Sequence, residues 1–128
     1  MAGLRAMPVL PVRDVALAVD FYRRVGFHIG GIWPARGTPS FAIMAWGTVT
    51  LALDREGGGH GGREGWQAYL YVTDSEGLHA HLTDIGIPVE RGPEEAFYGC
   101  VEIDVRDPDG NLVCFATDLT PGPDGPGL

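Results

Sequence analysis

The sequence predicts an α+β fold built from two βαβββ modules, and three observations predict it. Val12, Asp14 and Gly26 each have an identical residue 60 positions later, which indicates an internal sequence repeat. Each copy opens with the alternation typical of a strand and continues with the apolar spacing of a helix. Three short strand candidates follow each helix. Two curved, mixed, four-stranded sheets would then pack about a pseudo-twofold axis and enclose a cup, which is the candidate site.

The first strand of each module is expected at residues 7–12 and 67–72, where side chains alternate between two faces. One face carries Leu10 in the first copy and Leu70 in the second. This face is apolar throughout, so we expect it beneath the helix. The other face is mixed in the second copy, where it includes Tyr69. A mixed face suits a cavity wall better than a core.

A helix is expected after each of these strands. Asp14 and Asp74 begin the helices, since an aspartate side chain accepts a hydrogen bond from a free N–H at a helix start. Gly26 and Gly86 end them, because glycine readily adopts the positive φ found there. The apolar residues between these ends have the spacing of a buried helix face. They are Ala18, Phe21, Tyr22 and Val25 in the first helix and Leu78, Leu82 and Ile85 in the second.

Three strands are predicted after each helix. In the first module they span roughly residues 27–32, 40–45 and 48–53. In the second they span roughly residues 87–90, 100–105 and 111–117. The last two strands of each set flank a turn. The second of these turns contains Asp-Pro-Asp-Gly, in which Pro presets φ and Gly accepts a positive φ.

The two modules are expected to form one domain over roughly residues 1–120, a length that buries a real core. The first module takes up about residues 5–54 and the second about residues 66–118. The Gly-rich stretch 55–65 between them has the composition of a flexible linker. Residues 119–128 are rich in Pro and Gly, and we expect a flexible tail there.

The composition indicates a globular protein and argues against several classes of function. Hydrophobic residues make up 45% and charged residues 20% of the 128 residues. The net charge of −8 argues against a nucleic-acid partner, which requires a basic surface, and favours encounter with cationic small molecules. No apolar run is long enough to span a membrane. The N-terminus lacks the apolar core of a signal peptide, so we expect a cytoplasmic location. Cys100 and Cys114 are too few for a disulfide framework, so we expect them to be reduced, buried thiols.

Two stretches carry a resemblance to a known family, "PVLPVRDVALAVDFYRRVGF" at residues 8–27 and "YGCVEIDVRDPDGNLVCF" at residues 98–115. Together with the duplicated order of elements, they resemble the vicinal oxygen chelate superfamily. This superfamily holds glyoxalases, extradiol dioxygenases, fosfomycin-modifying enzymes and bleomycin resistance proteins. Both stretches look most like the bleomycin resistance branch, which has an aromatic-Gly pair before a Glu-containing strand. Tyr98, Gly99 and Glu102 occupy those places in this sequence.

The enzymes of this superfamily hold a divalent metal in the cup, and the resemblance implies where their ligands would lie. The positions fall on Met7 and Gln67 in the first strands of the two modules, on Cys114, and on Leu51 or Ala52. These side chains do not form the set of oxygen and imidazole donors that such a metal needs. We therefore expect no metal, no other cofactor and no catalytic residues. An unusual metal site that uses Gln67 and Cys114 is the alternative.

Aromatic side chains outside the helices are the candidates for a ligand surface, because flat ligands stack on such rings. Trp33 lies in a Gly/Pro-rich segment, where a Trp is costly to expose unless it covers something. Glu102 and Asp104 are candidates for receiving a cationic tail, and the resemblance implies a structural role for Glu102 as strongly. The predicted ligand-binding residues are Met7, Trp33, Phe41, Trp46, Trp66, Tyr69, Tyr71, Tyr98 and Glu102. A place in the core is the alternative for many of these aromatic residues.

The resemblance further implies a homodimer in which two chains exchange their first strands. Pro8 occupies the place of the hinge proline in the bleomycin resistance proteins. A proline suits an edge or exchanged strand, since it cannot donate to a central ladder, and an edge strand without exchange is the alternative. Two ligand grooves would then lie at the subunit interface.

These observations predict a non-catalytic antibiotic-binding protein. It would confer resistance by sequestering a bleomycin-type or other large, planar, aromatic, DNA-damaging natural product. The alternative is a glyoxalase-like lyase, transferase or dioxygenase-type enzyme with an atypical or absent metal site. A self-resistance or accessory role in a biosynthetic pathway is a third possibility. The sequence does not identify the ligand.

Overall fold

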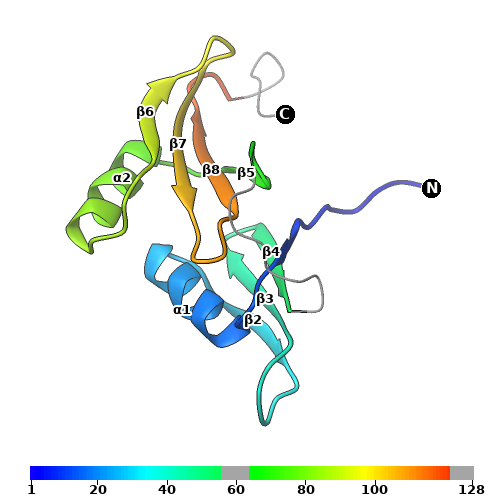
Figure 1. Ribbon diagram of the computed structural model, residues 1–128. Helices are drawn as coiled ribbons and strands as arrows, with labels where there is room; N and C mark the ends of the chain where they lie inside the picture. Colours follow the sequence, from blue (N-terminus) through cyan, green and yellow to red (C-terminus); the bar gives the residue numbers. More distant parts are fainter. Residues whose placement is uncertain (56–63, 122–128) are drawn as a thin grey trace. The chain divides into compact units, whose positions relative to one another are not determined.

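The computed structural model describes residues 1–55 and 64–121 and contains two βαβββ modules (Figure 1). The chain divides into two compact units with one module in each, and the turn Pro108–Gly110 belongs to the first unit. The predicted α+β fold with its duplicated order of elements is confirmed. Most of the predicted linker, residues 56–63, and of the predicted tail, residues 122–128, lies outside the described residues.

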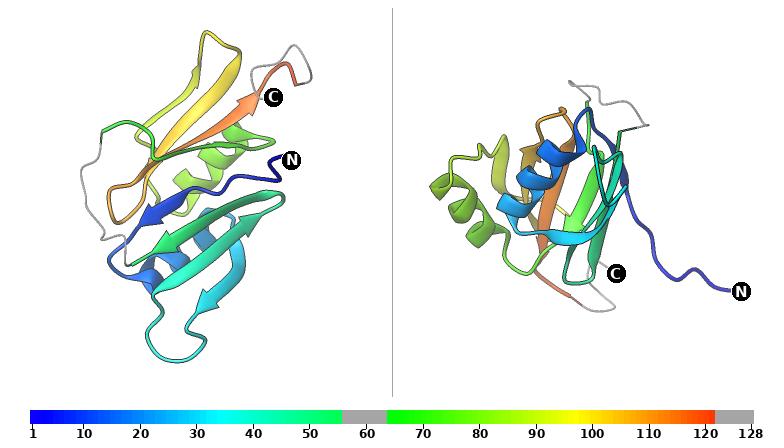
Figure 2. Two further views of the ribbon diagram at one scale, coloured as in Figure 1. Left: turned by 90° about the vertical axis from the view of Figure 1, so that its right-hand side faces the viewer. Right: turned by 90° about the horizontal axis from the view of Figure 1, so that it is seen from below.

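The first module forms a four-stranded mixed sheet with the order β1-β4-β3-β2. β1 and β4 are parallel, and the other neighbours are antiparallel. α1 packs on one face of this sheet, against β2, β3 and β4 (Figure 2). We call the opposite face the helix-free face of the first sheet. The elements are β1 (Val9–Pro11), α1 (Val15–Val25), β2 (His28–Trp33), β3 (Phe41–Trp46) and β4 (Val49–Asp54).

The second module repeats this arrangement with the sheet order β5-β8-β7-β6. β5 is parallel to β8, and β7 is antiparallel to both of its neighbours, β8 and β6. α2 packs against β6, β7 and β8. The opposite face is called the helix-free face of the second sheet. The elements are β5 (Ala68–Tyr71), α2 (Ser75–Asp84), β6 (Arg91–Glu95), β7 (Cys100–Arg106) and β8 (Leu112–Asp118).

The hydrophobic core of each module lies between its helix and its sheet. Tyr22 of α1 is fully buried, and its ring meets that of Phe27 edge-on at 5.7 Å between centroids. In the second module, Leu82 of α2, Ile103 and Phe115 are likewise buried. Apolar rings and aliphatic side chains removed from water stabilise the sheets through roughly 25 cal/mol per Å² of apolar area buried. The core therefore fixes which sheet face remains available for other contacts.

The predicted helix ends are confirmed. The Asp14 carboxylate accepts a hydrogen bond from the Leu17 N–H at 3.0 Å, and the Asp74 carboxylate accepts one from the Gly77 N–H at 2.9 Å. Each bond satisfies an N–H group that has no partner within the helix. Gly86, which follows the C-cap residue Ile85 of the second helix, has φ +80°, a conformation that side chains with a Cβ rarely adopt. These local signals position both helices over their sheets.

The sixth strand lies later in the chain than the sequence predicts, and this expectation was wrong. The predicted residues 87–90 form no strand, whereas Arg91–Glu95 do. Ile87 is buried, and its N–H donates to the Leu82 carbonyl at 2.9 Å, so the apolar residue closes the helix end rather than entering the sheet. β6 has no alternating apolar pattern. It pairs with β7 in an irregular register, and ion pairs from Arg91 join the two strands.

The other strands agree with the predicted ranges to within a few residues. β1 is shorter than predicted, with three residues, and Pro8 before it still accepts a hydrogen bond from the Ala52 N–H at 2.9 Å. Among the described residues, neither helix is long and apolar enough to cross a membrane.

Candidate functional site

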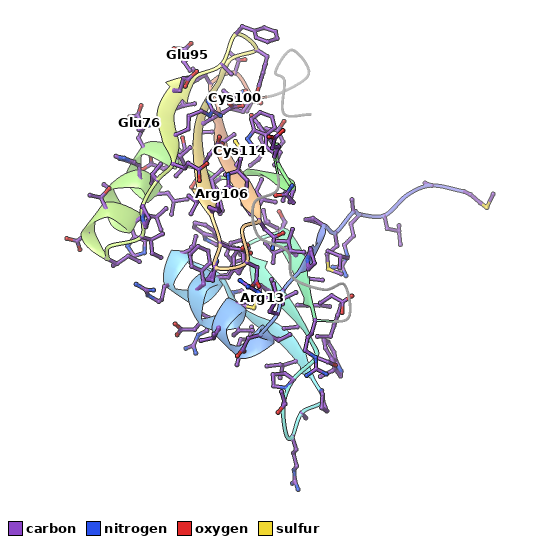
Figure 3. The ribbon with its side chains drawn as sticks, in the orientation of Figure 1. Arg13, Glu76, Glu95, Cys100, Arg106 and Cys114 are labelled. Atoms are coloured by element: carbon purple, nitrogen blue, oxygen red, sulfur yellow. The ribbon has the colours of Figure 1, made fainter. Side chains whose placement is uncertain are left out.

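The helix-free face of the second sheet carries an unusual mixture of small, aromatic and charged side chains. Register places Tyr69 beside Cys114 and Tyr71 beside Ala116, while Glu102 lies opposite Ala116 on β7. Cys100 and Cys114, labelled in Figure 3, form a buried cluster with Ala116, and the rings of Tyr69 and Tyr98 pack against it. Small residues thus form a floor on which aromatic rings lie.

Two buried carboxylates on β7 organise this face. The side chain of Glu102 is only 3% exposed and that of Asp104 only 8%. One Glu102 oxygen accepts a hydrogen bond from the Tyr69 hydroxyl at 2.6 Å and another from the Tyr98 hydroxyl. Asp104 accepts a bond from the indole N–H of Trp66 at 3.0 Å. The carboxylates therefore hold three of the aromatic side chains that the sequence predicts at the site.

A single cation joins both carboxylates. Nη2 of Arg91 lies 2.7 Å from the second oxygen of Glu102, and its Nε lies 2.7 Å from Asp104. The guanidinium also lies 5.9 Å from the centroid of the Trp66 ring, within the range of a cation–π contact. We call this set the Arg91 network. It comprises Arg91, Glu102, Asp104, Trp66, Tyr69 and Tyr98.

The pKa values within the network follow from these contacts. Burial alone raises the pKa of Glu102, but hydrogen bonds from Tyr69, Tyr98 and Arg91 outweigh burial and leave this pKa below its ordinary value. Burial and the hydrogen bond to Glu102 raise the pKa of Tyr69. The hydrogen bond to Glu102 and burial raise that of Tyr98. The network is therefore stable with Glu102 ionised and both hydroxyls protonated.

This ionisation pattern predicts a loss of stability in alkali. An unfolded tyrosine titrates near pH ~10, whereas Tyr69 and Tyr98 hold their protons to higher pH in the folded protein. Their contribution is therefore complete below about pH 10 and declines as the pH rises above that value. Denaturant midpoints measured from neutral to alkaline pH should fall, and Tyr69→Phe with Tyr98→Phe should flatten the fall. A fall of the same slope in the double variant would contradict the prediction.

Three of the predicted aromatic residues lie together at β5. The rings of Trp66 and Tyr69 meet at 5.0 Å and those of Tyr69 and Tyr71 at 5.3 Å, both edge-on. Trp66 and Tyr71 are exposed, at 45% and 43%. Phe97, which was not among the predicted site residues, is fully exposed and meets the Tyr98 ring at 5.0 Å. The second module therefore carries a set of adjoining rings, of which Trp66, Tyr71 and Phe97 are exposed.

The helix-free face of the first sheet brings together Trp33 and Phe41. Their centroids lie 5.9 Å apart, and the two residues are direct partners across β2 and β3. Gly31 makes this possible, because a Cβ there would lie 2.3 Å from the Trp33 ring. The indole therefore rests on bare backbone at Gly31 and remains 49% exposed. An irregularity between Ile29 and Gly31 shifts the register and places Trp33 on this face.

Gly31→Ala should displace the Trp33 ring. The added methyl group would occupy the space of the Trp33 indole, so we expect the ring to leave its position against Gly31. Affinity for a ligand that stacks on this ring should fall by about tenfold, or ~1.4 kcal/mol. Quenching of Trp fluorescence by iodide, compared with the same variant carrying Trp33→Phe, reports the ring. Gly3→Ala is the control, since a Cβ there would meet nothing within 4 Å. Unchanged quenching in Gly31→Ala would contradict the packing of the Trp33 ring against Gly31.

Trp46 and Met7 lie apart from this pair. Trp46 meets the Phe27 ring at 5.4 Å, and its indole lies against Gly26 at the end of α1. It is thus on the helix side of the sheet. Met7 precedes β1 and is half-buried. The structure therefore brings Trp33 and Phe41 together but does not add Trp46 to them.

Arg91 is the site residue that the sequence analysis missed. It lies in a stretch, "RGPEE", without an apolar pattern, so no local signal marked it. The available signal lay elsewhere, in two carboxylates that alternate along an otherwise apolar strand, Glu102 and Asp104. Buried carboxylates need a partner of opposite charge, so their alternation on one strand indicates a cation nearby in the fold.

The residues at the metal positions that the family resemblance implies do not fit a divalent cation. The Gln67 oxygen accepts the Leu112 N–H at 2.7 Å, so it is engaged in holding β8. Burial raises the pKa of Cys114, which keeps the thiol protonated. Leu51 and Ala52 offer no donor atom in their side chains. Within residues 1–55 and 64–121, no group of three or more His, Cys, Asp or Glu side chains is arranged to hold a metal.

Comparison with known families agrees with this architecture. Residues 5–115 match the family model described as "Glyoxalase/Bleomycin resistance protein/Dioxygenase superfamily". The chain belongs to this superfamily. Its members include enzymes as well as proteins of antibiotic resistance, as the family's description states. A comparison with curated proteins finds no match.

Solved structures of this superfamily place the chain near its bleomycin resistance branch. TioX from Micromonospora sp. ML1 is 25% identical with a TM-score of 0.74, over 90% of this chain and 98% of TioX. The bleomycin resistance determinant of transposon Tn5 is 25% identical with a TM-score of 0.69 over the same shares. A bleomycin-binding protein in complex with bleomycin is 24% identical with a TM-score of 0.69, again over 90% and 98%.

Proposed function

We propose that this protein binds a bleomycin-type or other large planar aromatic antibiotic without catalysis and confers resistance by sequestering it. One observation carries the proposal: side chains without a usable donor set stand at the metal positions, while aromatic rings gather on the helix-free faces. The bleomycin-binding neighbour is a protein of this fold that holds an antibiotic. Flat ligands gain roughly 0.5–1.5 kcal/mol per stacked ring beyond the burial of area.

The polar groups of the second module support binding rather than reaction. Glu102 has hydrogen bonds to both oxygens and a lowered pKa, so it is poorly suited to abstract a proton. The Cys114 thiol is buried and its pKa is raised, so it is a poor nucleophile. These groups hold rings in place. A surface of fixed rings can bind a flat molecule and leave it chemically unchanged.

The assembly that we propose is a cytoplasmic homodimer with exchanged first strands and a ligand groove at the subunit interface. The short β1 and the half-buried Pro8 before it suit an edge or exchanged strand. Light scattering at several protein concentrations gives the mass. A dimer that persists on dilution, and becomes monomeric when residues 1–11 with β1 are deleted, supports the exchange. A monomer at all concentrations contradicts it.

The function is tested by titrating the protein with bleomycin and with polycyclic aromatic antibiotics, by calorimetry and by Trp fluorescence. We expect saturable binding to at least one of them and a raised inhibitory concentration in cells that express the chain. No binding and no protection would contradict the proposal. Metal analysis of the purified protein tests the enzyme alternative. One divalent ion per chain, lost with Gln67→Ala or Cys114→Ala, would favour that alternative.

A further inference from the structure

The guanidinium of Arg91 is held more firmly than that of a surface arginine. Two of its ion pairs run to carboxylates that are almost fully buried, Glu102 and Asp104, while Arg91 itself is 32% exposed. Buried charges are costly to remove from water unless they are paired, so Glu102 and Asp104 hold this cation strongly. They also raise the pKa of Arg91, which keeps it charged at any physiological pH.

The place of this cation matters for any ligand of the second module. An aromatic surface backed by two carboxylates is an arrangement that attracts the cationic group of a ligand. Here the chain's own guanidinium already occupies that place, beside the Trp66 ring at 5.9 Å. Its remaining nitrogen, Nη1, meets only the exposed Glu94 at 3.2 Å among the ion pairs of the described residues. That contact is weak because Glu94 is solvated.

We propose that Arg91 determines the charge preference of the site. It makes the helix-free face of the second sheet reject a cationic group and accept planar ligands with an uncharged or anionic hydrogen-bond acceptor. Such an acceptor binds Nη1 when Glu94 turns to solvent, while the ring stacks on Trp66 or Tyr71. This inference rests on the proposed function and specifies its ligand class. It favours planar aromatic antibiotics without a positive charge at this end of the site.

The negative net charge acts in the opposite direction and can be separated experimentally. A charge of −8 attracts cations from a distance and raises their association rate, an effect that salt screens. Arg91 acts at contact distance, where salt screens less. At a salt concentration that largely screens the attraction by the net charge, Arg91 therefore determines the affinity. Binding is best compared at one fixed, moderately high ionic strength.

The test uses one planar ring system with three charges: acridone, which is neutral, acridine-9-carboxylate and 9-aminoacridinium. The wild-type protein should bind the first two more tightly than the cation. Arg91→Met exposes the two carboxylates to the ligand, so it should raise affinity for the cation and lower that for the carboxylate, each by about tenfold. Arg23→Met on α1 is the matched control, since it removes one exposed positive charge from the other module. It should leave the order unchanged.

A second variant keeps the test valid if Arg91→Met fails to fold. Glu102→Gln with Asp104→Asn retains hydrogen-bond acceptors and leaves Arg91 unneutralised, so affinity for acridine-9-carboxylate should rise by about tenfold. Binding of all three probes with the same order of affinity in the wild type and in both Arg91-network variants would overturn the inference and leave the proposed function standing. Failure of all three probes and of the antibiotics to bind would reject the proposed function and the inference together.

Discussion

Glu102→Leu is expected to lower the free energy of unfolding by about 3 kcal/mol. The substitution leaves the hydroxyls of Tyr69 and Tyr98 without their acceptor and removes one of two carboxylates paired with Arg91. Partly buried donors that lose their partners account for most of this cost. Denaturant unfolding followed by circular dichroism measures it. Glu102→Gln, which keeps an acceptor oxygen, should lose less than half as much.

A surface carboxylate provides the control for this prediction. Glu90 pairs with Arg106 at 2.7 Å, but its side chain is 49% exposed, and such pairs contribute ~0–1 kcal/mol. Glu90→Leu should therefore change stability by less than about 1 kcal/mol. Equal losses in Glu102→Leu and Glu90→Leu would show that the Arg91 network does not stabilise the second module.

Gly92→Ala is the second substitution with a large expected effect, a loss of roughly 3 kcal/mol. Gly92 has φ +97°, and a Cβ there would lie 2.2 Å from the backbone carbonyl oxygen of Glu102. Backbone cannot move aside as a side chain can, so β6 must separate from β7. The neighbouring Arg91 would then lose its position against both carboxylates. We expect lower stability together with a changed Trp66 environment, measured by near-UV circular dichroism.

Gly37→Ala separates backbone strain from collision. Gly37 has φ +82°, and a Cβ there would meet nothing within 4 Å, so its cost is the conformational one of about 1 kcal/mol. A loss in Gly92→Ala no larger than that in Gly37→Ala would contradict the close packing of β6 on β7. A loss at least twice as large agrees with it.

The fold could be predicted from the sequence because its signals are local and occur twice. Asp14 and Asp74 begin helices through bonds to N–H groups three residues on, and these depend on few other residues. The strands that follow have regular alternation and a turn between them. The sixth strand had no such signal. It depends on ion pairs from Arg91 to β7, which become visible only when the strands are placed side by side.

The candidate site could be predicted only in part, for a related physical reason. Residue type and alternation placed Tyr69 and Tyr71 on one face of β5, as the structure shows. The same reasoning could not separate Trp46 from Trp33, because an irregularity in β2 changes which face each later residue occupies. Nor could it show that the Glu102 carboxylate is surrounded by the hydroxyls of Tyr69 and Tyr98 and the guanidinium of Arg91. Long-range pairing determines these features, and a single sequence records no pairing.

Binding without turnover is tested by an equivalence titration. A fixed amount of the antibiotic that binds most tightly is mixed with increasing protein, and free drug is measured, followed by mass spectrometry of drug released on denaturation. We expect free drug to fall linearly to zero at a fixed molar ratio and to be recovered with its mass unchanged. Consumption of excess drug by substoichiometric protein, or recovery of a chemically altered product, would contradict it.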